Sequence, residues 1–202
     1  DLLMTSIRSF MKKLIGNKDN ITIVSGLPRS GTSMMMSALK AGGMPLLTDE
    51  IRGADPNNPK GYYEFERVKK LPKGDVAWLN SARGKAVKVI SALLEYLPPD
   101  YHYQVIFMER NFEEILASQH RMLVRTGKEQ QHPVADETIR QSYQNHLSEV
   151  KFYLEDKDWI ETLYVSYNQI LQQPLEGFKG VAVFLDGRVD PAAMAKVVDP
   201  PL

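Results

Sequence analysis

The stretch ITIVSGLPRSGTS, residues 21–33, places an apolar segment directly before a loop rich in glycine and hydroxyl side chains. Its first part, Ile21 to Ser25, is rich in β-branched residues, as is typical of a central parallel strand that is buried on both faces. A helical pattern from Thr32 to Ala41 follows and ends at two glycines, Gly42 and Gly43. The stretch therefore predicts a strand, a tight loop and a helix in direct succession.

The rest of the chain repeats this alternation of short apolar runs and longer helical patterns. We expect further strands at Ala86–Ser91, Tyr103–Met108 and Thr162–Tyr167, and a loop-rich segment at residues 46–75. Strands that alternate with helices indicate the α/β class with a central parallel sheet flanked by helices.

Helix signals are clear in the second half of the chain. Asn111 is a candidate N-cap, and Glu114 stands three residues later, in the position of a capping box. This helix should stop near Gly127. The next begins near Asp136 or Thr138, and its apolar residues recur every three or four positions. Further helical segments are expected at 175–185 and 191–198.

The length of 202 residues suggests a single domain over residues 1–202, which begins with a lead-in helix at residues 1–20. Apolar and basic residues mix in this lead-in, which leaves an amphipathic helix or a membrane-surface anchor open, but it lacks the order of a signal peptide. The abrupt end on Pro200-Pro201-Leu202 leaves a further C-terminal piece open.

Composition excludes several classes of function. The chain has no cysteine, so disulfides, thiolate metal sites and a cysteine nucleophile are ruled out. This fits a reducing compartment, and we expect a cytoplasmic location. No apolar run reaches the roughly 20 residues of a membrane span. The 25 basic and 25 acidic residues balance, which argues against nucleic acid as a partner.

The loop between the first strand and its helix, residues 26–33, has the composition of an anion-binding loop. Gly26 and Gly31 allow backbone N–H groups to converge at the positive end of the helix dipole. Arg29 adds a charge, and three hydroxyls stand at Ser30, Thr32 and Ser33. A phosphate or sulfate site is favoured over the alternative, a tight turn with incidental glycine and serine.

The same loop departs from the nucleotide triphosphate-binding pattern G-x-x-x-x-G-K-[ST]. Thr32 stands where that pattern has its lysine, and we find no apolar strand ending in an aspartate suited to Mg²⁺. No metal site is therefore expected. A small-molecule kinase with an unusual loop remains an alternative, as does a non-catalytic nucleotide-binding module.

A second anion-binding pair is formed by Arg110, which closes the third strand, and Ser118 in the following helix. Because carboxyl ends of parallel strands share one edge of a sheet, Arg110 should lie beside the anion-binding loop. Alternatively, Arg110 pairs with Glu113 or Glu114.

Together these segments resemble the sulfotransferase family, in its bacterial or carbohydrate-type branch. The family's 5′-phosphosulfate loop corresponds to Pro28-Arg29-Ser30-Gly31-Thr32, and its arginine and serine for the 3′-phosphate correspond to Arg110 and Ser118. Two weaker similarities are the segment 58–64, NPKGYYE, and the segment 167–174, which begins with Tyr167 but lacks the family's usual acidic residues.

The resemblance implies a P-loop NTPase-like three-layer fold and transfer of a sulfuryl group from 3′-phosphoadenosine 5′-phosphosulfate (PAPS) to a hydroxyl or amine. The product nucleotide is then adenosine 3′,5′-bisphosphate (PAP), and the partner is a small-molecule or carbohydrate acceptor. The implied PAPS-binding residues are Pro28, Arg29, Ser30, Gly31, Thr32, Ser33, Arg110, Ser118 and Tyr167.

Three residues are the catalytic candidates. Arg29 cannot release a proton, so its expected role is electrostatic. Glu64 is the first candidate for the base that removes the acceptor's proton, unless it is a plain surface carboxylate; His102 and His120 are runners-up. Lys88 interrupts an apolar strand and either reaches the transferred group or lies on an exposed edge.

Aromatic residues could form the acceptor pocket, which we expect from residues 46–75 and the loop 127–136. The candidates either line that pocket or belong to the core; they are Tyr62, Tyr63, Phe65 and Trp78.

Overall fold

The computed structural model describes residues 19–49, 61–125, 127 and 136–198. Its centre is a four-stranded sheet in which every neighbouring pair of strands is parallel. In spatial order the strands are β2 (Ala86–Lys88), β1 (Ile21–Gly26), β3 (Tyr103–Glu109) and β4 (Ile160–Ser166). The predicted α/β class with a central parallel sheet is confirmed.

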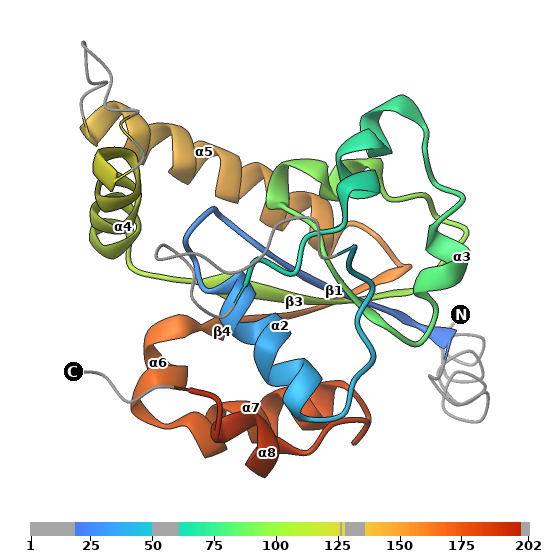
Figure 1. The fold of residues 1–202 in the computed structure, drawn as a ribbon. Coiled ribbons are helices and arrows are strands. Elements are labelled where there is room, and N and C mark those ends of the chain that lie inside the picture. Colours follow the sequence, from blue (N-terminus) through green and yellow to red (C-terminus); the bar gives the residue numbers. More distant parts are fainter. Residues whose placement is uncertain (1–18, 50–60, 126, 128–135, 199–202) are drawn as a thin grey trace.

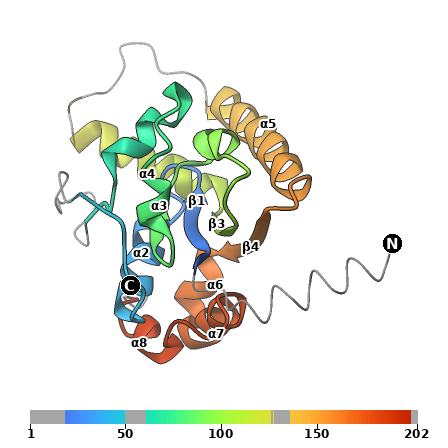
Figure 2. The same cartoon turned by 90° about the vertical axis from the view of Figure 1, so that its right-hand side faces the viewer.

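Helices cover both faces of the sheet, which gives three layers (Figure 1). One face carries α2 (Thr32–Ala41), α6 (Tyr167–Gln172), α7 (Pro174–Phe184) and α8 (Pro191–Ala195). The other carries η2 (Glu66–Lys73), α3 (Leu79–Ala82), η3 (Ser91–Tyr96) and α5 (Asp136–Glu155). The view in Figure 2 shows α5 and the pair α7–α8 on opposite sides of the strands. Helix α4 (Phe112–Arg125) follows β3 and contacts α5 through the Tyr143 hydroxyl and Gln119.

Two hydrophobic clusters explain why the central strands are apolar throughout. Successive side chains of a strand point to opposite faces, so Val24 packs with α2 and α7 whereas Ile23 packs toward α3 and α5. Ile106 and Val105 divide in the same way on β3. All six residues of β1 are buried, as its sequence predicts.

The boundaries of two strands differ from the prediction. The strand expected at 86–91 ends at Lys88, because Val89 donates one last bond to Val24 and the chain then turns into η3. The strand expected at 162–167 begins at Ile160 and ends at Ser166. The hydroxyl of Ser166 caps the following helix by accepting from the N–H of Gln169, so Tyr167 is helical.

Helices also confirm some predictions and correct others. Helix α2 has the predicted bounds, and the side chain of Asn111 accepts from the N–H of Glu113 at the start of α4. The capping box is wrong, because the Glu114 carboxylate accepts instead from Arg110 and Asn168. Within the segment expected to be loop, residues 66–73 form the 3-10 helix η2.

Several predictions concern segments outside the described residues. These are the lead-in helix up to residue 18, the start of the NPKGYYE motif at 58–60, most of the loop 127–136 and the chain end at 199–202. Among the helices that the structure does describe, none is long and apolar enough to cross a membrane.

Candidate functional site

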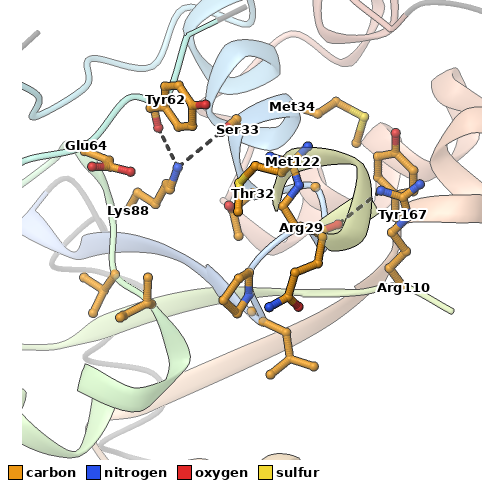
Figure 3. Close-up of a pocket in the computed structure, with 17 residues that line it drawn as sticks. Arg29, Thr32, Ser33, Met34, Tyr62, Glu64, Lys88, Arg110, Met122 and Tyr167 are labelled. Atoms are coloured by element: carbon orange, nitrogen blue, oxygen red, sulfur yellow. Dashed lines mark hydrogen bonds between the residues drawn. The ribbon is translucent and has the colours of Figure 1, made fainter. Parts of the chain in front are cut away.

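The carboxyl ends of all four strands converge on one cavity of about 410 Å³. The loop after β1, the end of β2 at Lys88, Arg110 after β3 and Tyr167 after β4 all line it. Open α/β sheets place ligand sites at this edge, because the loops that leave the strands there are free to vary. Figure 3 shows the labelled side chains around the cavity.

Two glycines give the loop after β1, residues 26–33 and the candidate anion-binding loop, its shape. Gly26 has φ +145°, and a Cβ there would come within 2.6 Å of the Met108 backbone oxygen. Gly31 has φ +103°, and a Cβ there would lie 2.4 Å from the ring of Tyr167. Both positions therefore need glycine for conformation and for space. Arg29 itself adopts a left-handed backbone with φ +70°.

The start of α2 presents backbone donors to the cavity. The first intrahelical bond from this turn is donated by Met35 to the Gly31 oxygen. The N–H groups of the first turn of a helix point out of its amino end, and the residues of this turn, Thr32, Ser33 and Met34, all line the cavity. Their position at the positive end of a ten-residue helix suits a bound anion.

Ser30 belongs to the same loop, but its side chain does not face the cavity. Its side chain is only 1% exposed, it does not line the cavity, and its N–H donates to the Leu27 oxygen at 3.1 Å. The Ser30 hydroxyl has no hydrogen-bond partner among the described residues. It lies against Gly26, where a Cβ would meet it at 2.5 Å. The expectation that this hydroxyl faces a ligand is corrected, because the turn directs it into the protein.

Arg29 and Ser118 form a contact that the sequence pattern did not predict. The Arg29 Nε donates to the Ser118 Oγ at 2.9 Å, and Ser118 is 6% exposed and outside the cavity lining. The prediction paired Ser118 with Arg110. The structure instead uses Ser118 to hold Arg29, the charged residue of the anion-binding loop.

Arg110 is held on three sides. Its Nε donates to the Glu114 Oε2 at 2.8 Å, its Nη1 donates to the Arg29 carbonyl oxygen at 3.1 Å, and its guanidinium lies 4.3 Å from the centre of the Tyr167 ring. The alternative in which Arg110 pairs with Glu114 is thus observed. The hydrogen bond from Arg110 lowers the pKa of Glu114 below its ordinary value, and Asn168 lowers it further.

Lys88 reaches the site from the end of β2. Its Nζ donates to the Tyr62 carbonyl oxygen at 2.5 Å and to the Ser33 Oγ at 3.2 Å (Figure 3). The lysine is therefore half-buried at an edge strand and directed into the cavity, which combines both interpretations of its position. It links the segment around residue 62 to the start of α2.

Glu64 lines the same cavity with a side chain that is 25% exposed. Its main chain is fixed indirectly to the sheet, because Asp49 donates its N–H to the Glu64 oxygen and Leu47 bonds to Ala86 of β2. The two other candidates for the catalytic base lie elsewhere. His102 and His120 are both exposed and neither lines the cavity.

The aromatic candidates divide between cavity and core. Tyr62 is buried and lines the cavity. Trp78 is 2% exposed, donates its indole N–H to the Asp75 oxygen and meets Phe65 edge to face, so both belong to the core. Tyr63 packs against the hydrophobic cluster on the opposite face of the sheet, the one that contains residues of α2 and α7. For Phe65, Trp78 and Tyr63 the structure therefore supports the alternative in which they are packing residues.

Sequence reasoning missed part of the cavity wall. Met34 and Met122 line it, and Asn168 donates to Glu114, the carboxylate that accepts from Arg110. The contact of Arg110 with Glu114 is one of the two alternatives that the sequence left open, whereas the contact of Asn168 with Glu114 was not foreseen. Among the described residues, no three histidine, aspartate or glutamate side chains gather as metal ligands would.

Comparisons with known proteins identify the fold. No family model matches the chain, and no curated protein matches it by sequence. Among solved structures, mouse sulfotransferase SULT7A1 complexed with PAP is similar with a TM-score of 0.50 and 18% identity, over 90% of this chain and 63% of that one. The sulfotransferase domain from the curacin biosynthetic pathway has a TM-score of 0.50 and 14% identity, over 91% of this chain and 79% of that one. A sugar kinase from Janibacter sp. has a TM-score of 0.42 and 15% identity, over 87% of this chain and 98% of that one.

These similarities establish a P-loop-like α/β fold of the kind that sulfotransferases share. The chain spans less than two thirds of the length of the SULT7A1 chain.

Proposed function

We propose that this chain is a PAPS-dependent sulfotransferase that acts on a hydroxyl or amine acceptor. One observation carries the proposal: Arg29, Lys88 and Arg110 come from three different strand ends and line a single cavity at the start of α2. Such a concentration of positive charge in a chain of zero net charge suits a ligand with several anionic groups. The fold shared with two sulfotransferases supports it.

The available donors fit the chemistry of PAPS, which carries a phosphosulfate at one end and a separate phosphate on its ribose. We assign the phosphosulfate to the anion-binding loop, with Arg29, Thr32 and Ser33 as donors beside the backbone of Pro28 and Gly31. We assign the ribose phosphate to Arg110, whose guanidinium is held against Tyr167. Ser118 then supports the site by orienting Arg29.

The proposed reaction forms a bond between sulfur and the acceptor oxygen or nitrogen and breaks the bond between sulfur and the phosphate oxygen. Negative charge grows on the departing phosphate oxygen, and donors already aimed at it lower the barrier. Arg29 supplies a permanent charge there. Lys88, anchored by Ser33 and the Tyr62 oxygen, brings a second cation to the same edge.

The acceptor must also lose a proton, and we assign its removal to Glu64. A carboxylate is suited to this step only if it lies within reach of the acceptor. Glu64 lines the cavity on the side where Figure 3 shows Lys88 and Tyr62, away from Arg110 and Tyr167. In-line transfer requires the acceptor to bind opposite to the departing nucleotide, so we assign the acceptor to this side of the cavity.

A thermal-shift comparison tests the nucleotide. A ligand that binds only the folded state raises the melting temperature in proportion to the logarithm of its concentration. We expect PAP to stabilise the protein in the presence of EDTA. Stabilisation only by ATP with Mg²⁺ would contradict the proposal and favour a kinase.

The role of Glu64 is tested by Glu64→Gln, with Glu66→Gln as the control on the neighbouring exposed carboxylate. With an acceptor found in a panel of alcohols, amines and sugars, we expect kcat to fall roughly a hundredfold in Glu64→Gln, as is common for loss of a general base. PAP binding should stay unchanged in both variants. If turnover also stays unchanged, Glu64 is not the base.

A further inference from the structure

Arg110 contacts a small polar cluster of residues that do not line the cavity and that have no role in the proposed reaction. The Glu114 carboxylate accepts from Arg110 with one oxygen and from the Asn168 Nδ2 with the other, at 2.7 Å. These residues come from α4 and α6, two helices that follow different strands. A carboxylate tied at both oxygens cannot rotate freely, so its hydrogen bond also restricts the arginine.

This arrangement leaves one edge of the guanidinium for a ligand. An arginine has five N–H donors, and within the described part of the chain Arg110 donates to protein oxygens from Nε and from Nη1. The Tyr167 ring covers one flat face. The remaining donors lie in the plane of a group that lines the cavity, so the cluster determines where they point.

The same arginine also contacts the anion-binding loop. Its Nη1 donates to the carbonyl oxygen of Arg29, the residue with the left-handed backbone. The orientation of Arg110 is therefore tied to that of the loop, and a disturbance of Glu114 should be felt where the second anion binds before it is felt at the loop itself.

We propose that Glu114 and Asn168 are positioning residues that make Arg110 selective for a nucleotide with a second phosphate. This inference rests on the proposed function, and it assigns to two further residues the discrimination between adenosine 3′,5′-bisphosphate and 5′-AMP. The two probes share the adenosine and the 5′-phosphate, so their affinity ratio isolates the second phosphate.

The electrostatics predict an opposite result for the simplest alternative. If Glu114 were only an internal anion that competes for Arg110, then Glu114→Gln would strengthen binding of the bisphosphate by removing a nearby negative charge. If Glu114 holds Arg110 in place, the same substitution weakens that binding. The sign of the change in Glu114→Gln therefore distinguishes the two roles.

The experiment measures the dissociation constants of both nucleotides by calorimetry for the wild type, Glu114→Gln and Asn168→Ala. Asn168→Ala removes the support of Glu114 without any change in charge. Matched controls are Glu113→Gln and Gln172→Ala, exposed residues of the same two helices. Because Glu114 and Asn168 are only half-buried, we expect all variants to fold, which thermal unfolding checks.

We expect the bisphosphate-to-AMP affinity ratio to fall about tenfold in Glu114→Gln and in Asn168→Ala, the size of one lost charge-assisted hydrogen bond, with AMP binding nearly unchanged. The controls should keep the wild-type ratio. A wild type that prefers the bisphosphate, with variants that keep or raise the ratio, overturns the positioning role alone. A wild type without that preference contradicts the proposed function and this role together.

Discussion

Arg110 and Arg188 lie at opposite ends of the central sheet and have different surroundings. Arg110 follows the carboxyl end of β3 and lines the cavity. Arg188 follows α7 and reaches the amino-terminal part of the sheet, where its Nη2 donates to Gln104 at 2.5 Å and to Thr22 at 3.2 Å. Its Nε donates to the Leu185 oxygen.

The network around Arg188 is closed by protein groups. Gln104, 1% exposed, also donates from its Nε2 to the Phe184 oxygen at 2.9 Å, so the same few residues fasten the end of α7 to two strands. Burial lowers the pKa of Arg188 below its ordinary value. The comparison shows that one residue type serves two purposes: a guanidinium enclosed by protein acceptors stabilises packing, whereas one that keeps donors at a cavity can bind an anion.

The largest expected effect is on catalysis, at the carboxyl ends of the strands, where the cavity lies. Arg29→Ala removes the permanent charge of the anion-binding loop, and we expect kcat/KM for sulfuryl transfer to fall roughly a thousandfold, as for loss of a charge-stabilising donor. Arg29→Lys should recover part of this. Steady-state kinetics with a saturating acceptor measure it. An Arg29→Ala enzyme of normal activity would show that the charge of Arg29 is not needed for catalysis.

A smaller effect, on stability, is expected at the amino-terminal part of the sheet, where Arg188 lies. Arg188→Met leaves the buried acceptor of Gln104 without its partner, so the free energy of unfolding should fall by about 2 kcal/mol. Urea denaturation measures it, with Arg83→Met, an exposed arginine, as the control. The bisphosphate-to-AMP affinity ratio should not change. A fall in that ratio would mean that the surroundings of Arg188 and of Arg110, at opposite ends of the sheet, are coupled.

The smallest expected effect is the pH dependence of the stability that the Arg110–Glu114 pair contributes. Its hydrogen bond lowers the pKa of Glu114 in the folded state, so the pair contributes stability above the ordinary glutamate pKa and loses it as pH falls through the lowered value. We expect the melting temperatures of the wild type and Glu114→Gln to differ by a constant amount above the ordinary glutamate pKa and to converge as the pH falls through the lowered pKa of Glu114. Differential scanning calorimetry measures both curves. Divergence at low pH would contradict the sign of the shift.

Much of the fold could be predicted because the relevant signals are local. The β-branched run at 21–25 and the paired glycines at 42–43 defined β1 and α2 without reference to any other part of the chain. Short elements were missed for the opposite reason. η2 contains Pro72 and follows from the burial of Val68 and Leu71 against the core, which no single segment encodes.

The site was predictable in its residue types more than in its contacts. The loop motif selected Arg29, and the strand-end position selected Arg110, which the structure brings to one cavity. The pairing of Arg110 with Glu114 was one of the alternatives, but the contacts between residues far apart in the chain were not predictable. Ser118 is 89 positions from Arg29 in the chain, and Asn168 is 54 positions from Glu114. Nothing in sequence spacing links residues at such separations.

The sequence by itself determined the α/β alternation, the glycine-bounded loop after β1 and the absence of cysteine chemistry, because apolar periodicity, glycine and residue type act over a few positions. Only the tertiary structure decided that Ser118 holds Arg29, that Glu114 and Asn168 hold Arg110, and that Ser30 turns inward. The physical reason is that side-chain partners depend on how strand ends and helices meet in space, and parallel connections join segments that are far apart in the chain.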